Sequence, residues 1–462
     1  MIKPVKYKNI FSDWRNMSLQ KIAKYLIILI SSIIFLAMLI FIFFHDPIIN
    51  TFLKDRITKS FNETNPEYSL KLGDMHYSIW NNSLGSDSVS LKSTDSSITY
   101  NAASISVGGI NWINIILQGD FKIDDLTSSV FDAQDIRINY LKSQNELLLK
   151  TLYVSIDDSL IIADLIKYYS LIDDEEFFAK SRFRQTRFRL DIPKIKAIGV
   201  DCISLLKGTS YKSRNISINN MIADILVNMD KPYDKSSSKP LMPNEFFSAL
   251  EETVKVDSLK IINAQLKYCE RYAVKATPGI ITFNKVNVLV CGINNYSERS
   301  DTATVYAEGI FMNSATMKLL MKIPLTSKDF SFKYSGSLSS MNATNLNKFI
   351  VPAEFHHINS GFINSASYNI NVNSGHANGN LRIVYEDLSI SILNKETGSQ
   401  DGIFNRISSL IGELFVIRGT NMPDKNGKIE IGEIKYSRNP DDYFLQFVWF
   451  ALRSGVSDVV GF

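Results

Sequence analysis

The chain has 462 residues, of which 45% are hydrophobic, and 50 Lys and Arg against 47 Asp and Glu give a formal net charge of +3. This length exceeds one ordinary core and predicts two or more units, and the balanced charge excludes a strongly basic, nucleic-acid-binding face. The three cysteines, Cys202, Cys269 and Cys291, form no C-x-x-C pair. This argues against a disulfide framework and a zinc site, while one bridge stays open.

The first feature in the chain is an uncharged apolar run, YLIILISSIIFLAMLIFIFF, at residues 25–44. About 20 apolar residues is the length with which a helix crosses the hydrocarbon core. Its Leu, Ile and Phe residues favour insertion by on the order of −5 to −9 kcal/mol. We therefore predict a membrane anchor that includes Tyr25, Leu26, Ile30, Phe35, Leu39 and Phe44. The alternatives are a buried helix and a cleaved signal peptide, but the run is long for the latter, and HDPIIN follows it instead of a small-residue cleavage site.

The charges on the two sides of this run predict its orientation. Residues 1–24 hold six Lys and Arg against the single acid Asp13, whereas mixed charge follows Pro47. The positive-inside rule then makes residues 1–24 a cytoplasmic tail. We predict a bacterial inner-membrane protein that crosses the membrane once, with the bulk of the chain in the periplasm.

An amphipathic helix follows, because Ile48, Phe52, Ile57 and Phe61 recur at helical spacing before Pro66. It either covers one end of the core or lies against the membrane. From Tyr68 the apolar residues alternate with period two in short runs separated by Gly, Asn, Ser and Asp. We predict a mostly β fold: an elongated, twisted antiparallel sheet that forms a groove, with short helices.

Residues 229–245, MDKPYDKSSSKPLMPNE, have the composition of a linker. They divide the exported part into a β-rich region at 45–228 and a β-groove region at 246–462. Near the end, residues 428–436 read as a strand and residues 441–460 as a helix.

The alternation also predicts which residues line the groove, because polar neighbours alternate with them and one face must be sheltered. These candidates are Ile105, Val107, Ile136, Ile138, Val286, Val288, Val290, Leu319, Met321 and Ile383. A second set of candidates, Arg182, Arg184, Arg187 and Arg189, forms a basic run. That run is either a solvated strand face or a contact for anionic lipid head groups.

Motifs for catalysis are missing from the sequence, which holds no G-x-S-x-G, H-E-x-x-H, P-loop or dinucleotide fingerprint. His356 and His357 are neighbours, so on a strand they face opposite sides. Residues 422–433 mimic a calcium loop, but the first ligand position is Met422, and Asn426-Gly427 is better read as a tight turn. We predict no enzyme, no metal site and no cofactor.

The order of these features resembles the AsmA-like family of envelope proteins, of the Bacteroidetes type, which is related to TamB and to chorein-type bridge-like lipid-transfer proteins. The resemblance rests on the basic N-terminus, the membrane helix, the opening LKDRITKSFNE and YSLKLGDMHYSI, and the unit ASISVGGINWINIILQGDFKIDDL, which PKIKAIGVDCISLLKGTSYKSRNISI weakly repeats. It also rests on GSLSSMNATNLNKFI, GNLRIVYEDLSISIL and the ending YFLQFVWFALRSGVSDVVGF.

The resemblance implies a protein that binds or conducts lipid along an apolar groove and supports outer-membrane biogenesis. Its expected partners are phospholipids and other envelope proteins, with no nucleic acid. Two other classes stay open. One is a scaffold that assists assembly of outer-membrane proteins without lipid, and the other is an exported hydrolase.

Overall fold

The computed structural model describes residues 28–36, 49–78, 80–110, 126–236, 239–296, 302–393 and 417–461. Of the predicted anchor residues, Ile30 and Phe35 lie in the described helix at 28–36, where they are exposed. Tyr25, Leu26, Leu39 and Phe44 lie outside the described residues. No helix within the described ranges is long and apolar enough to cross a membrane. The membrane span therefore stays a prediction.

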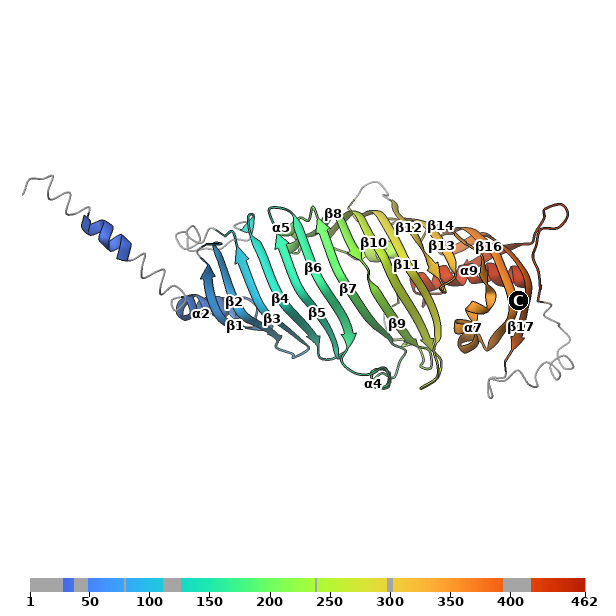
Figure 1. Ribbon diagram of the computed structural model, residues 1–462, viewed down its shortest axis with the longest axis horizontal. Coiled ribbons are helices and arrows are strands. Elements are labelled where there is room, and N and C mark those ends of the chain that lie inside the picture. Colours follow the sequence, from blue (N-terminus) through green and yellow to red (C-terminus); the bar gives the residue numbers. More distant parts are fainter. Residues whose placement is uncertain are drawn as a thin grey trace, which may run out of the picture.

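The prediction of a mostly β, elongated and twisted fold is confirmed, because strands make up 54% of the structure and form one long sheet of 18 strands (Figure 1). The first nine strands are β1 (Tyr68–Ser78), β2 (Ser83–Ser93), β3 (Ile98–Gly108), β4 (Val130–Tyr140), β5 (Asn145–Ser155), β6 (Leu160–Ser170), β7 (Thr186–Ile198), β8 (Ser210–Asn219) and β9 (Ile222–Asn228). The other nine are β10 (Thr253–Arg271), β11 (Gly279–Asn294), β12 (Thr302–Phe311), β13 (Ala315–Pro324), β14 (Phe332–Leu338), β15 (Met341–Asn342), β16 (His356–Asn373), β17 (His376–Ile392) and β18 (Ile431–Ser437).

The sequence predicted a mostly antiparallel sheet, and the observed sheet is mixed: its pairings are antiparallel except for those of β8 and β9 with β10. Each strand pairs antiparallel with the next from β1 to β7 and from β10 to β14. β16 then pairs antiparallel with β14 and β17, and β17 pairs antiparallel with β18. β8 and β9 both pair with β7 and act as one interrupted strand, and both run parallel to β10. A parallel pair needs a crossover, and residues 229–252 make it. This crossover contains the whole segment predicted as a linker, residues 229–245, and the sheet runs on past it without a break.

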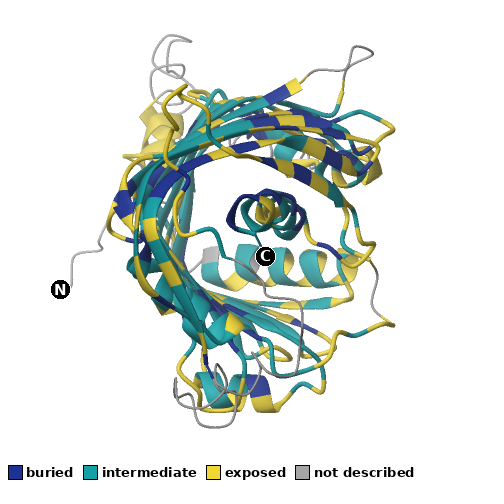
Figure 2. Cartoon of the chain, turned by 90° about the vertical axis from the view of Figure 1, so that its right-hand side faces the viewer, coloured by how far each residue is buried: buried dark blue, intermediate teal, exposed yellow. Residues whose placement is uncertain are grey.

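The helices are short and lie at the margins and inside the curve of the sheet. They are η2 (Ile49–Leu53), α2 (Lys54–Thr64), α4 (Asp174–Ala179), α5 (Cys202–Leu206), α6 (Pro243–Ala249), η4 (Ala343–Leu346), α7 (Asn347–Glu354) and α9 (Phe444–Val460). The helices predicted at 48–61 and 441–460 are confirmed as η2 with α2 and as α9. Figure 2 shows α9 inside the curve of the sheet. We call the side on which α9 lies the concave face.

A crease bends the strands near their middle. Residues with positive φ mark it: Ser88 in β2, Asp135 in β4, Leu165 in β6, Asn220 between β8 and β9, Asn263 in β10 and Lys285 in β11. The strand registers place these residues in or beside one line along the sheet. Side chains bridge it, as where Asn263 Nδ2 donates to Asn220 Oδ1 at 2.7 Å. Positive φ bends a strand sharply, so a line of such residues curls the sheet into a groove.

The crease also shifts the side-chain alternation by one residue. Ala163 and Ile166, three apart in β6, pack in one cluster on the concave face with Leu149 and Leu152, which are three apart in β5. Without the crease, residues three apart on a strand would face opposite sides. Apolar residues on both sides of the crease therefore line the same concave face.

The free edge of β1 is covered by the N-terminal helices. The Asn50 side chain exchanges two hydrogen bonds with the backbone of Met75, each 2.7 Å, and Asn62 Oδ1 accepts from the Leu70 N–H at 2.8 Å. These bonds occupy backbone groups that another strand would otherwise pair with.

At the other end of the sheet, side chains of α9 bond to the backbone of the edge strand β18 in the same way. Asp458 Oδ2 accepts from the Glu433 N–H of β18 at 2.7 Å, and Ser454 Oγ accepts from the Lys435 N–H at 3.2 Å. Both edge strands thus have side chains of a covering helix bonded to their backbone. These caps oppose growth of the sheet by strand addition.

Candidate functional site

The concave face is built from rows of residues that pair side by side across the strands. A first row crosses 16 strands without a charged residue. From β1 to β18 it reads Met75, Ser86, Ile105, Ala133, Leu152, Ala163, Ile195, Ile218, Ile261, Val288, Ala307, Leu319, Gly336, Tyr368, Leu381 and Gly432. Since register partners share a face, these side chains form one continuous strip.

Two further rows flank the first and are also free of charge. The second row reads Tyr77, Leu84, Val107, Phe131, Val154, Ile161, Ala197, Ile216, Leu259, Val290, Val305, Met321, Tyr334, Ile370, Gly379 and Ile434. The third row lies beyond the crease and reads Leu70, Leu91, Tyr100, Ile138, Leu147, Tyr168, Leu190, Ala223, Leu266, Phe283, Phe311 and Ala315.

The ten predicted groove residues come together on this face. Ile105, Val288 and Leu319 lie in the first row, Val107, Val290 and Met321 in the second, and Ile138 in the third. The remaining three are Ile136, which pairs with Leu149 of the same face, Val286, which lies beside Gly309, and Ile383, which packs with Met321. Period two in the sequence thus selected one face of the sheet. Contact of that face with lipid stays a prediction.

Sequence reasoning missed most of the row members. Phe131, Leu147, Leu152, Ile195 and Ile218 belong to the same face. Their signal was present in the sequence as short runs of alternating residues. The crease hides it, because the shift of one residue breaks the period within a strand.

Burial along the first row separates covered ends from an open middle. Met75 and Ser86 at the N-terminal end are 4% and 6% exposed, and Leu381 at the C-terminal end is 1% exposed. Between them, from β3 to β13, most row members are only partly buried. Such a long partly exposed apolar surface is unusual for a soluble face and marks a contact surface.

The C-terminal part of the face is filled by α9. Phe447, Ala451 and Val459 of α9 are at most 1% exposed and pack against Tyr334 and Ile370 of the second row. The Tyr334 hydroxyl donates to the Val448 carbonyl at 3.1 Å. Two predicted groove residues, Met321 and Ile383, belong to this packed core. The open part of the groove therefore ends near β13 and β14.

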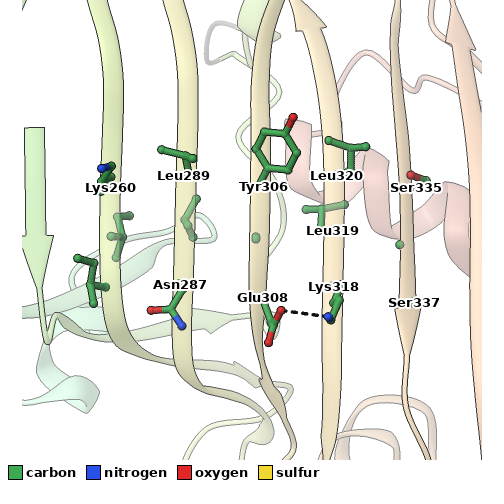
Figure 3. Close-up of a pocket in the computed structure, with 15 residues that line it drawn as sticks. Lys260, Asn287, Leu289, Tyr306, Glu308, Lys318, Leu319, Leu320, Ser335 and Ser337 are labelled. Carbon is green, nitrogen blue, oxygen red and sulfur yellow. Dashed lines mark ion pairs between the residues drawn. The ribbon is translucent and has the colours of Figure 1, made fainter. Parts of the chain in front are cut away.

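A hollow of about 670 Å³ lies at the middle of β10–β14, before the region filled by α9 (Figure 3). It is lined by five consecutive members of the first row and by their strand neighbours, among them Leu289, Tyr306 and Leu320, whose side chains point to the face away from α9. The five row members are Ile261, Val288, Ala307, Leu319 and Gly336. The Tyr368 side chain lies against Gly336 on the concave face and does not line the hollow, so the hollow opens on the other face of the sheet. An ion pair between Glu308 and Lys318, 3.3 Å apart, lies at its border.

The predicted head-group arginines are mostly bound within the protein. Arg187 is 3% exposed, and its guanidinium bonds to Asp174 of α4 at 3.0 Å and to Asp224 of β9 at 2.6 Å. Arg189 also reaches Asp174, at 2.8 Å. Although burial raises the pKa of Asp224, its bonds to Arg187 and then Lys267 lower that pKa overall.

The other two arginines of the run lie before β7. Arg184 stacks over the Tyr233 ring at 4.1 Å and donates to the carbonyls of Lys231 and Met229 in the crossover. Arg182 is exposed and lies 5.6 Å from the Phe183 ring centre. Of the four, Arg182 is the arginine whose guanidinium faces solvent without an acidic partner among the described residues.

The segment that mimics a calcium loop in the sequence contains a tight turn in the structure. Asp424 Oδ1 accepts from the N–H groups of Asn426 and Lys428, both at 2.8 Å, and Gly427 has φ +75°, as a tight turn requires. Burial raises the pKa of the Cys202 and Cys269 thiols. Among the described residues, no three His, Cys, Asp or Glu are grouped to hold a metal ion.

No protein-family model matches the chain, and no curated protein matches it. The resemblance to AsmA-like proteins therefore stays a prediction.

Proposed function

We propose that this protein is anchored in the inner membrane by residues 25–44 and binds phospholipid acyl chains in its concave groove in the periplasm, in support of outer-membrane biogenesis. The observation that carries the proposal is the set of three uncharged rows, left partly exposed from β3 to β13. An unoccupied face of this kind exposes apolar surface to water, and acyl chains remove that cost.

The energy available is sufficient. Burial of a methylene contributes about 0.8 kcal/mol, so an acyl chain of ordinary length gains on the order of 10 kcal/mol before the costs of ordering. The ten strands from β3 to β13 span roughly 40 Å at about 4.8 Å per strand. One acyl chain spans about half of a 30 Å hydrocarbon core. The open groove is thus two to three chains long.

Two other classes receive less support. A scaffold for outer-membrane proteins would offer a sheet edge to incoming strands, but Asn50, Asn62, Ser454 and Asp458 occupy backbone groups at the two edges. A hydrolase would need a nucleophile beside a base. The groove rows consist of aliphatic, aromatic, Met, Ser and Gly residues, which supply no base.

The deciding experiment is mass spectrometry of lipids that co-purify with the full chain from detergent-solubilised membranes. We expect phospholipid in stoichiometric or higher amount. A protein that folds fully and carries no lipid above the level of an unrelated membrane protein would overturn the proposal.

A further inference from the structure

The first row passes from partly buried to fully buried residues at Tyr368 of β16. Its neighbour Gly336 leaves a gap that the Tyr368 ring covers, since a Cβ at position 336 would lie 2.3 Å from the Tyr368 hydroxyl oxygen. Tyr368 also packs edge-on against Tyr334 at 6.0 Å between ring centres. Burial raises its pKa to about 12. Tyr368 therefore stands between the open part of the first row and the core under α9.

Beyond Tyr368 the concave face is no longer accessible. Leu381 of the first row and Ile434 of the second are 1% and 0% exposed under α9. Gly432 and Gly455 let α9 approach the sheet closely, because a Cβ at position 432 would lie 2.3 Å from the Gly455 carbonyl oxygen. This contact holds α9 across the end of the groove, and α9 further binds the β18 edge.

The opposite end is covered too. Met75 and Ser86, the first two members of the first row, are buried where the segment of Asn50 bonds to the β1 backbone. Both ends of the row are thus covered by protein. As far as the described residues show, the open part of the row is its middle, between β3 and β13.

From this we propose that α9 and Tyr368 form a stop that ends the acyl-chain site at β14, so that lipid enters and leaves through the side of the groove between β3 and β13 and not through its C-terminal end. This inference rests on the proposed lipid binding and adds a mode of access to it. The groove then has a limited length, and lipid does not pass along it from one end of the sheet to the other.

Two leucines of the first row test the stop with little disturbance. Leu152 lies in the open middle, and Leu381 lies beyond Tyr368 under α9. Each is replaced by cysteine, as Leu152→Cys and Leu381→Cys, in the full chain in membranes with the three native cysteines changed to alanine. The probe is a maleimide with a dodecyl chain. We expect labelling at position 152 at least ten times faster than at position 381.

Photocrosslinking in living cells tests access for natural lipids. Benzoylphenylalanine replaces Phe131, which is partly buried in the second row, or Tyr334, which is 2% exposed in the same row. We expect phospholipid adducts at position 131 and none at position 334. Adducts of equal yield at both positions would overturn the stop and leave the proposed function standing. Adducts at neither position would overturn the proposed function itself.

The variant Tyr368→Ala distinguishes a stop from a merely buried region. Removal of the ring opens a path from the open part of the first row toward Leu381, so the dodecyl maleimide should now label Leu381→Cys several times faster. The same double variant must keep the thermal transition of Leu381→Cys within a few degrees. Unchanged labelling in a folded double variant would remove Tyr368 from the proposal.

Discussion

Leu147 and Leu148 are neighbours in β5, yet their cross-strand partners differ completely. Leu147 pairs with Ile138 and Tyr168 of the third row, whereas Leu148 pairs with Arg137 and Lys167. The two leucines are both partly buried. They therefore offer a matched pair of positions, Leu147 on the concave face of the sheet and Leu148 on the opposite face.

We expect Leu147→Glu to abolish lipid co-purification and Leu148→Glu to preserve it. The first change places a carboxylate where acyl chains would lie, while the second places it beside two cations, where it is tolerated. Lipid per protein is measured by mass spectrometry, and folding by thermal unfolding. If Leu147→Glu unfolds the protein while Leu148→Glu does not, the face is a packed core and the lipid proposal loses its support.

The topology of the anchor gives a second prediction. Alkaline phosphatase fused after Phe462 should be active, because the Lys and Arg bias of residues 1–24 places the rest of the chain outside the cytoplasm. A cytoplasmic reporter at the same position should be inactive. The opposite pattern of the two reporters would reverse the orientation and exclude the periplasmic site of action.

Arg187 should contribute to the free energy of unfolding more than to the binding of lipid head groups. Its guanidinium is buried between Asp174 and Asp224, so Arg187→Met leaves two carboxylates without their partner and should lower the free energy of unfolding by about 3 kcal/mol. Arg182→Met removes an exposed cation and should change it by less than about 0.5 kcal/mol. Denaturant unfolding of the two variants checks this. Equal effects would contradict the structure of this network.

The pair of Arg438 and Glu245 ties the crossover to the segment before α9, and it gives a prediction for pH. Arg438 donates to both oxygens of Glu245, at 2.6 and 3.1 Å, and this holds the pKa of Glu245 below its usual value of 4.5. The stabilisation is therefore complete above pH 4.5 and is lost as the pH falls through the lower, folded value. We expect Glu245→Gln to cost about 1–2 kcal/mol at pH 7. The difference from the natural protein should shrink below pH 4.5, and a difference independent of pH would contradict the ion pair.

Much of the groove was predictable because period two is a direct consequence of strand geometry. Ile105, Val107, Val288 and Leu319 were found in this way, without knowledge of strand order. The crossover was not predictable, since the parallel pairing of β9 with β10 joins residues from either side of a segment whose composition is that of a linker. Only the pairing of the two strands reveals its role.

The basic run shows a different limit of sequence reasoning. In the sequence Arg187 is typical of a solvated strand face, because arginines alternate with uncharged residues in this run. Its partners Asp174 and Asp224 lie 13 and 37 residues away in the chain. Burial of this arginine depends on α4 docking on the sheet, where Phe178 packs with Leu226. No local pattern records that contact.

The crease was also invisible to sequence patterns, and it yields the last prediction. Leu165 has φ +50° and is 51% exposed in β6, a strained backbone for a leucine that buries little of its side chain. Leu165→Gly should therefore keep or raise the free energy of unfolding by up to about 1 kcal/mol, since glycine adopts positive φ without strain. The matched change Leu148→Gly, in a strand position without positive φ, should lower it by about 1 kcal/mol or more. Denaturant unfolding of both variants measures the two signs. A loss of similar size in both would show that the crease at Leu165 carries no strain, and that the bend of the groove arises from the packing of its rows.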